Sequence, residues 1–135
     1  MRAIDLKTAE IDRAFVASTE AIRTVHIWDK WLYVGGMDPK IRGFDLTTGE
    51  TKDFRGHSSW ILCMDTYTFT DSEGEPKYTR LFSGSDDFTI RVWDTKTAVC
   101  FNVFNGHKSG ILCMSFLDGK LYSGSYDHYV IVWNL

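Results

Sequence analysis

Residues 81–94 read LFSGSDDFTIRVWD, and the rest of the chain is organised around this pattern. An apolar start leads through Ser-Gly-Ser into an acidic turn at Asp86 and Asp87, and then into the run TIRVW. Two β-forming segments separated by a turn rich in Asp and Ser are typical of a hairpin. The pattern recurs at residues 121–134 (LYSGSYDHYVIVWN) and 32–45 (LYVGGMDPKIRGFD), each time with an Asp six places before an aromatic residue.

Length and composition restrict the class of protein. The chain has 135 residues, of which 44% are hydrophobic and 15% aromatic, which suits one domain with a buried core. No apolar run approaches the roughly 18 residues of a membrane helix, and the start MRAIDLKTAE does not resemble a signal peptide. A formal net charge of −3 without a basic block argues against a nucleic-acid binder that relies on phosphate contacts, although it does not exclude recognition of single-stranded RNA by aromatic residues. We expect no membrane association and a cytoplasmic location, with the nucleus as the alternative.

The cysteines are expected to be structural. Cys63 and Cys113 hold equivalent places in the runs WILCMD and GILCMS, and Cys100 stands apart from both. No C-x-x-C spacing is present. We therefore expect Cys63 and Cys113 to be small buried hydrophobic residues in a reducing compartment, without a metal or redox role.

The recurring pattern defines repeat units. The units end, in one common register, at Ile4, Phe44, Trp93 and Trp133. Their spacing fits a repeat of about 40–45 residues, except that the interval before Trp93 is longer. The additional residues lie between Met64 and Leu81, where Thr, Tyr and Phe residues flank 71–76 (DSEGEP). We predict an extended hairpin that projects from this unit.

The strands at the start and end of each unit differ in character. Residues 60–64 (WILCM) and 111–114 (ILCM) are continuous apolar runs, which indicates burial on both faces of an inner strand. More polar segments that follow the units are expected to form outer strands. Those segments are AEIDRAF, GETKDF and AVCFNVF, and they end at Phe15, Phe54 and Phe104.

These features resemble the WD40 repeat. The two complete units each supply a His after Gly, a Ser before Gly, an Asp in the turn and a Trp at the end of the third strand. The two sets are His57, Ser83, Asp87 and Trp93, and His107, Ser123, Asp127 and Trp133. The resemblance implies a hydrogen-bonded chain from Asp through His and Ser to Trp, since these groups need partners when buried. The first unit keeps Asp38 but has Ala17-Ser18, Val34 and Phe44 at the other places, so its blade should lack the network.

The resemblance implies an all-β fold, with β-propeller blades of four antiparallel strands. Three WD40-type units are expected per chain, at about 5–44, 45–93 and 94–133. Propellers typically close with four to eight blades, so three units would form an open arc with apolar faces exposed at both ends. Residues 1–16 are expected to supply an outer strand to the C-terminal blade or to a partner's blade.

Two ways of completing the ring are compatible with the sequence. Two chains could pair head to tail into a six-bladed ring, which is slightly favoured because the chain is cut at strand boundaries. Alternatively, the chain could be the C-terminal fragment of a longer, seven-bladed propeller that acts as a substrate-recruiting or assembly module, for example of a ubiquitin ligase. Both readings describe an interaction scaffold for proteins or peptides.

The recurring Ser, His and Asp raise the alternative of a hydrolase. No G-x-S-x-G elbow is present, and the Trp that accompanies each set favours a structural role. We therefore predict no enzyme, with no catalytic residues, cofactor or metal site.

Partner binding is expected on the loops beside the two sets, because exposed aromatic residues are frequent interface hot spots. The candidates are Trp60, Asp86, Phe88, Lys108, Tyr126 and His128. Packing of Trp60 and Phe88 between neighbouring blades is an equally weighted alternative. The hairpin around residues 71–76 is a second candidate surface on the opposite face, because the fold does not require it.

Overall fold

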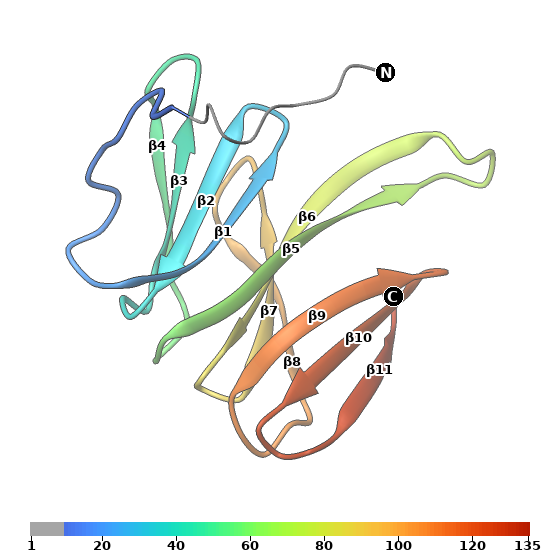
Figure 1. The fold of residues 1–135 in the computed structure, drawn as a ribbon. Helices are drawn as coiled ribbons and strands as arrows, with labels where there is room; N and C mark the ends of the chain where they lie inside the picture. Colours follow the sequence, from blue (N-terminus) through green and yellow to red (C-terminus); the bar gives the residue numbers. More distant parts are fainter. Residues whose placement is uncertain (1–9) are drawn as a thin grey trace.

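A computed structural model describes residues 10–135, and this range forms eleven β-strands in three antiparallel sheets (Figure 1). Blade 1 contains β1 (Ile22–Trp28), β2 (Trp31–Gly36), β3 (Ile41–Asp45) and β4 (Thr51–Phe54). Blade 2 contains β5 (Ile61–Thr70), β6 (Pro76–Ser85), β7 (Thr89–Asp94) and β8 (Cys100–Asn105). Blade 3 contains β9 (Ile111–Leu117), β10 (Lys120–Ser125) and β11 (Val130–Asn134). Within this range there is no helix of the length and apolarity needed to cross a bilayer.

The three copies of the sequence pattern form three equivalent hairpins. The first residue of each copy pairs with the aromatic that ends it. The pairs are Leu32 with Phe44, Leu81 with Trp93, and Leu121 with Trp133. The predicted all-β fold is therefore confirmed, with four antiparallel strands in blades 1 and 2 and three in blade 3.

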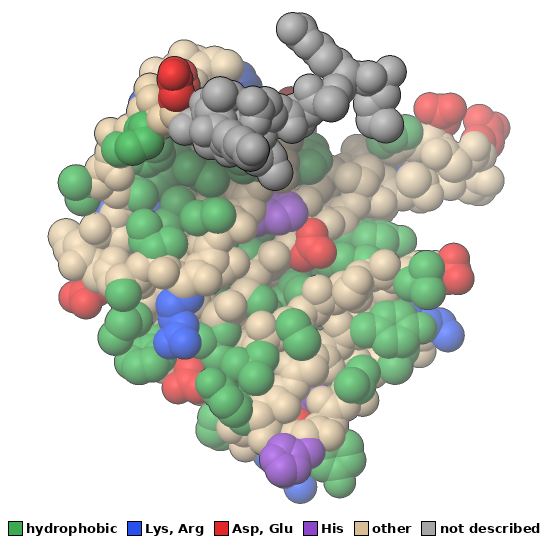
Figure 2. Space-filling model, viewed as in Figure 1, with side chains coloured by type: hydrophobic (Ala, Val, Ile, Leu, Met, Phe, Trp, Pro, Cys, Tyr) green, Lys and Arg blue, Asp and Glu red, His purple; other side chains and the backbone are tan. Residues whose placement is uncertain are grey.

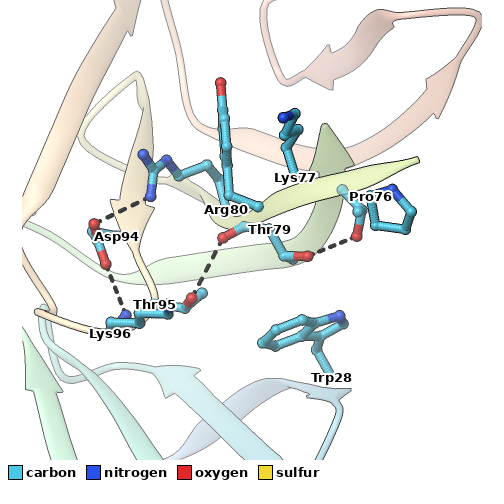
Figure 3. Close-up of a pocket in the computed structure, with 10 residues that line it drawn as sticks. Trp28, Pro76, Lys77, Thr79, Arg80, Asp94, Thr95 and Lys96 are labelled. Carbon is cyan, nitrogen blue, oxygen red and sulfur yellow. Dashed lines mark hydrogen bonds and ion pairs between the residues drawn. The ribbon is translucent and has the colours of Figure 1, made fainter. Parts of the chain in front are cut away.

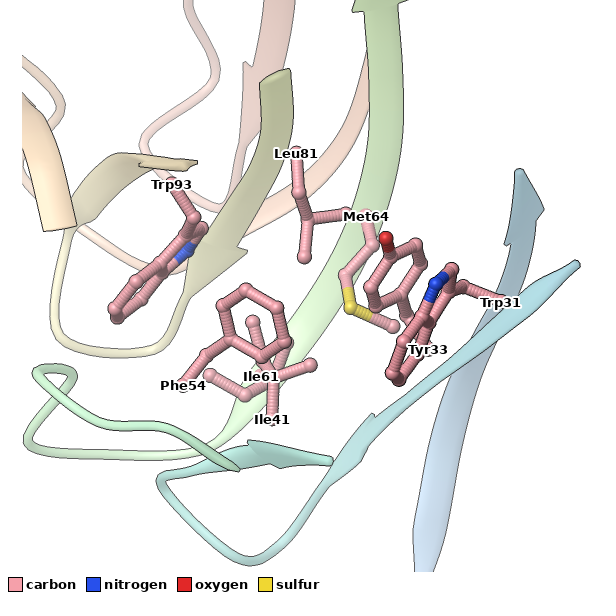
Figure 4. Packing of buried hydrophobic residues seen from close by; sticks show 8 residues of the cluster. All are labelled: Trp31, Tyr33, Ile41, Phe54, Ile61, Met64, Leu81 and Trp93. Atoms are coloured by element: carbon pink, nitrogen blue, oxygen red, sulfur yellow. The ribbon is translucent and has the colours of Figure 1, made fainter. Parts of the chain in front are cut away.

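The hydrophobic core consists of two clusters, one on each face of blade 2. Figure 4 shows the cluster against blade 1. Against blade 1 the cluster contains Trp31, Tyr33, Ile41, Phe54, Ile61, Met64, Leu81 and Trp93. Against blade 3 it contains Cys63, Phe82, Ile90, Val92, Ile111 and Leu121. The apolar run at the start of β5 thus contributes to both clusters, as its continuous pattern predicts.

Glycine in the middle of Ser-Gly-Ser allows blades 2 and 3 to approach closely. A Cβ built on Gly84 would lie 2.6 Å from the Cys63 sulfur and 2.8 Å from the Ile111 Cγ2. Any larger residue would push the two blades apart, since packed interiors have little room to yield.

Blade 3 departs from the expectation of burial on both faces. Ile111 is fully buried, but Leu112 and Cys113 are exposed. Cys63 behaves as predicted: it is buried, and burial raises the pKa of its thiol to about 12. The prediction is wrong for Cys113. This residue lies on the face of blade 3 that is directed away from blade 2, and no described strand covers that face.

The N-terminal segment pairs with no strand among the described residues. Residues 10–21 have no strand assignment, β11 has no fourth strand beside it, and residues 1–9 of the expected outer strand lie outside the described residues. Among the described residues, blade 3 therefore has three strands, and the outer strand expected from residues 1–16 for this blade or for a partner's blade stays a prediction. Phe15 nevertheless packs against Phe44, with ring centroids 5.5 Å apart. The equivalent pairs of the next blades, Phe54 with Trp93 and Phe104 with Trp133, are 5.8 Å and 5.3 Å apart.

The insertion in the second unit forms the predicted hairpin. The strands β5 and β6 continue to pair beyond the body of blade 2, as far as Thr70 and Pro76. This extension, which we call the arm (residues 67–80), projects from the blade in Figure 1 and carries acidic side chains at its tip in Figure 2.

Candidate functional site

The first polar set forms a continuous hydrogen-bonded tetrad between the β4–β5 loop, the β6–β7 turn and β7. The indole N–H of Trp93 donates to Ser83 Oγ at 2.8 Å. Ser83 Oγ lies 2.7 Å from Nε2 of His57, and Nδ1 of His57 donates to Asp87 Oδ2 at 2.7 Å. All these polar groups are buried or nearly so, and each finds its partner inside the set. The tetrad thereby fixes the turn around Asp87 to the blade.

The second set has nearly the same geometry in blade 3. Trp133 donates to Ser123 Oγ at 2.8 Å, and Ser123 lies 2.7 Å from Nε2 of His107. Nδ1 of His107 donates to Asp127 Oδ2 at 2.8 Å. The agreement between the two sets indicates that each tetrad is assembled by its own blade and its entry loop.

Hydrogen bonding holds both carboxylates in the ionised form. Burial opposes ionisation of Asp87, but hydrogen bonds from His57 and Thr89 outweigh it and keep the pKa of this carboxyl well below its ordinary value. Burial also opposes ionisation of Asp127. The backbone amide of Lys108 and further hydrogen bonds outweigh it and lower the pKa of this carboxyl to about 2. Each Asp also receives the amide of the residue after the tetrad His, at 3.1 Å from Ser58 and 2.9 Å from Lys108.

A second serine, which is not a member of the predicted sets, connects the same loops. Ser85 Oγ donates to the carbonyl of Ser59 at 3.3 Å and accepts the amide of Asp87 at 3.1 Å. Ser125 repeats this arrangement with Ser109 and Asp127. The signal that could have revealed this role is the second Ser of the repeated Ser-Gly-Ser, which is conspicuous in both copies.

The Ser, His and Asp of the tetrads are not arranged for catalysis. Ser83 is fully buried, and its hydroxyl is already engaged by both His57 and Trp93. A nucleophile must reach the substrate carbonyl, which a hydroxyl enclosed in this way cannot do. Among the described residues, no cluster of three or more His, Cys, Asp or Glu side chains is placed to hold a metal ion.

The tetrads bring the predicted partner-binding residues to one end of blades 2 and 3. The amide of Asp86 donates to the carbonyl of Trp60 at 2.9 Å, which joins the β6–β7 turn to the β4–β5 loop. The amide of Tyr126 donates to the carbonyl of Gly110 at 3.1 Å in blade 3. A Cβ built on Gly110 would lie 2.6 Å from Asp86 Oδ1, so the loops of the two blades are adjacent.

The predicted partner-binding residues at this end form what we call the loop face. It consists of Trp60, Asp86, Phe88, Lys108, Tyr126 and His128. Trp60 is 39% exposed and has the Arg23 guanidinium 5.5 Å from its ring centroid. Phe88 and His128 both adopt a positive φ, of 76° and 74°, at the last position of their turns. Of the six residues only Asp86 is half-buried, whereas the others are exposed.

Blade 1 forms its sheet without a tetrad. Val34 is buried where the Ser would stand, and the half-buried Phe44 replaces the Trp. Asp38 instead accepts the amide of Lys40 at 3.1 Å within its own turn. Blade 1 therefore forms a four-stranded sheet with apolar side chains in place of the tetrad Ser and Trp.

Comparisons with known proteins agree with this architecture. The family model described as "WD domain, G-beta repeat" matches residues 49–94 and 98–134. The chain is 35% identical over 109 residues to the U3 small nucleolar RNA-associated protein 15 homolog of Xenopus tropicalis, a match over 78% of this chain and 20% of the relative. It is 43% identical over 53 residues to an F-box protein of Saccharomyces cerevisiae, over 39% of this chain and 7% of the relative.

A solved structure has the same arrangement of blades. The structure of U3-55K superposes with a TM-score of 0.75 at 25% sequence identity, over 91% of this chain and 38% of that chain. The chain thus spans a fifth or less of the length of the two relatives described above and well under half of this structural neighbour. With two repeats matched by the family model and the tetrads in place, the chain belongs to the WD40-repeat β-propeller family.

Proposed function

We propose that this chain is an arc of a WD40 propeller that binds a protein or peptide through its loop face. The observation that supports this proposal most directly is the pair of nearly identical tetrads. They hold two neighbouring turns rigidly while leaving Trp60, Phe88 and Tyr126 exposed beside them. Rigid aromatic side chains lose little conformational entropy on binding, so they suit a docking surface.

Replacement of two loop-face aromatics tests this proposal. Trp60→Ala combined with Tyr126→Ala is expected to abolish capture of protein partners, because the two side chains carry much of the exposed apolar area of this face. The measurement is a quantitative pull-down from the chain's own cell extract, with bound proteins compared by mass spectrometry. Val99→Ala, which shortens an exposed apolar side chain outside the loop face, is the matched control. Unchanged capture by the double variant would refute the loop-face proposal, and loss of its circular-dichroism spectrum would assign Trp60 and Tyr126 to the core.

We further propose that another set of blades completes the ring. On the open face of blade 3, Val130 and Val132 occupy the places that Ile90 and Val92 occupy in blade 2. In blade 2 these places are covered by Ile111 and Leu121 of the next blade. At the other end of the arc, Val25 and Ile27 on β1 are exposed. Hydrophobic side chains are visible over blade 3 in Figure 2. Contiguous apolar surface of this kind marks an interface.

A second copy of the chain is the first candidate for these missing blades. Residues 10–16 of one copy would lie along β11 of the other copy as its outer strand. Phe15 fits this arrangement, because it packs against Phe44 as the last residue of an outer strand packs against the aromatic residue of the next blade. Analytical ultracentrifugation measures this directly. A species of about twice the 15.5 kDa chain mass is expected, and a monomer at concentrations up to about 100 μM, far above the Kd of a stable dimer, would exclude the six-bladed dimer.

Blades of a longer propeller are the second candidate, favoured by the short coverage of the solved neighbour and of the relatives. In this reading the chain is part of a substrate-recruiting or assembly module, cytoplasmic or nuclear, and the similarity to an F-box protein favours such a role. Mass spectrometry of the endogenous protein, purified by an antibody against the arm, distinguishes the two candidates. A native chain much longer than 135 residues supports the second, and a native chain of this length refutes it.

A further inference from the structure

The arm has a free sheet edge. Its β6 portion pairs with β5 through to Pro76, but β7 pairs with β6 only between Arg80 and Gly84. Residues 76–79 therefore have no strand on the β7 side within the part of the chain that the structure describes. On this side Thr95 Oγ1 donates to the carbonyl of Thr79, at 3.4 Å. A sheet edge with unpaired amides and carbonyls can accept an extended peptide as an additional strand.

A basic groove of about 410 Å³ lies on one side of this edge (Figure 3). Three cations line it, Lys77, Arg80 and Lys96, and its lining contains a single acid, Asp94. That carboxylate is already engaged, because it accepts from the Arg80 guanidinium at 3.2 Å and from the amide of Lys96 at 2.8 Å. The Lys77 ammonium reaches Asp71 only at 4.0 Å. Arg80 and Lys77 thus have acidic partners and Lys96 has none among the described residues, which leaves the groove with positive charge in a chain whose net charge is −3. The indole ring of Trp28 faces β6 across the groove.

An apolar hollow of about 230 Å³ lies on the other side of the edge. Phe69 stacks on Tyr78 with ring centroids 5.0 Å apart, and both line the hollow together with the exposed Phe101. The Arg80 guanidinium lies 4.6 Å from the ring centroids of Tyr78 and Phe101. Tyr78 and Arg80 line both the hollow and the basic groove, so the two cavities flank the same strand.

We propose that the free edge of the arm binds an extended segment of a partner protein in which acidic residues alternate with apolar ones. Successive side chains of a strand point to opposite faces. A strand added beside residues 76–79 would thus place one set of side chains in the basic groove and the other in the apolar hollow. Pro76 and Lys77 at the edge disfavour pairing with an arbitrary strand, whereas an acidic partner offsets the Lys77 charge. This surface lies at the opposite end of blade 2 from the loop face, and the inference does not depend on the function proposed above.

Synthetic peptides of about ten residues test the inference by fluorescence polarisation. An alternating Glu-Val peptide is expected to bind at least about tenfold more tightly than an alternating Lys-Val peptide, because the groove discriminates by charge. The alternating Glu-Val peptide should also bind more tightly, by a similar factor, than a peptide whose Glu and Val residues stand in two separate blocks, because only alternation places side chains in both cavities. No binding of the alternating acidic peptide, equal binding of all three, or preferential binding of single-stranded oligouridine would each overturn the inference.

Charge reversal locates the site. The double variant Lys77→Glu, Lys96→Glu is expected to lose at least about tenfold in affinity for the Glu-Val peptide and to gain binding of the Lys-Val peptide. The matched control is Arg13→Glu, Arg55→Glu, which makes the same change of net charge at two exposed cations that do not line the groove. Equal losses of affinity in both double variants would show that only the net charge of the protein matters, and would refute the site. The Trp60→Ala, Tyr126→Ala variant should keep full peptide binding, so the two proposals can fail independently.

Discussion

Blades 2 and 3 have closely similar hairpins but differ in what covers them. Ile90 and Val92 of blade 2 are 0% and 4% exposed, whereas their equivalents in blade 3, Val130 and Val132, are 68% and 48% exposed. Gly84 of blade 2 lies against Ile111 of the next blade, while a Cβ built on Gly124 would meet only the sulfur of Cys113 in its own blade. The hydrogen-bond distances of the two tetrads nevertheless agree within 0.1 Å.

This difference separates two kinds of interaction. A tetrad draws all its members from one blade and its entry loop, and the tetrad of blade 3 forms although no following blade is present among the described residues. Burial of the outer blade face requires a neighbour, and hydrophobic burial is the larger favourable contribution to folding. Blade 1 supports this division, since it has four strands and a packed face without any tetrad. We infer that the tetrads fix the shape of the loop face, while contacts between blades supply most of the stability.

The largest expected effect comes from replacing the tetrad tryptophans. Trp93→Ala should lower the free energy of unfolding by about 3–5 kcal/mol, because it opens a cavity beside Phe54 and removes the indole N–H that donates to the buried Ser83 hydroxyl. Trp133→Ala should cost about half as much, since Trp133 is only half-buried. Urea denaturation of both variants measures the difference. Equal costs would mean that blade 3 is covered in solution, and the comparison of the two blades would then have to be revised.

The reactivity of the two equivalent thiols, Cys63 and Cys113, tests the same comparison. Cys63 is buried with its pKa raised to about 12, so it should react with a disulfide reagent only after opening of the blades. Cys113 at the equivalent place is exposed and should react at least about a hundredfold faster at pH 8. Single-cysteine variants followed by absorbance give the two rates. Slowing of the Cys113 reaction as the protein concentration rises would show that another blade covers this face.

The sequence predicted what recurs in it. The hairpin of residues 81–94, the two aligned polar sets and the insertion before Leu81 all depend on local patterns that repeat in register, and each corresponds to a feature of the structure. The exposure of Cys113 could not be predicted in this way. Its sequence surroundings match those of Cys63, and the difference lies in a neighbouring blade that the described chain does not contain.

The N-terminal segment illustrates the same limit. AEIDRAF has the composition of an outer strand and brings Phe15 to the expected aromatic partner. A strand also needs a partner with free amides and carbonyls, and no sequence pattern within the segment supplies one. The groove beside the arm was missed for a different reason. Trp28, Lys77 and Lys96 come from separate elements and meet only in the folded chain.

Substitution of the central glycines should have an intermediate effect. Gly84→Ala is expected to destabilise by about 1–3 kcal/mol, because the new Cβ would overlap with Cys63 and with the Ile111 side chain. Gly124→Ala should cost less, since only the Cys113 sulfur lies within contact distance and the face beyond it is open. Thermal denaturation followed by circular dichroism measures both. A more severe effect at Gly124 would contradict the assignment of the open face.

Acidification should produce the smallest change in the free energy of unfolding, and it should affect blades 2 and 3 alike. Hydrogen bonds lower the pKa of Asp127 in the folded state from an ordinary value of 3.8 to about 2, and the pKa of Asp87 is lowered as well. A carboxyl whose pKa is lower in the folded state than in the unfolded state binds fewer protons when folded. Its contribution to stability is therefore complete above about pH 5 and is lost as the pH falls from about 4 through 2. The variants Asp87→Asn and Asp127→Asn should each flatten the dependence of the unfolding free energy on pH in this window, measured by urea denaturation at a series of pH values. If only one of them did so, the two tetrads would not be electrostatically equivalent, and the division between interactions within a blade and interactions between blades would fail at its simplest point.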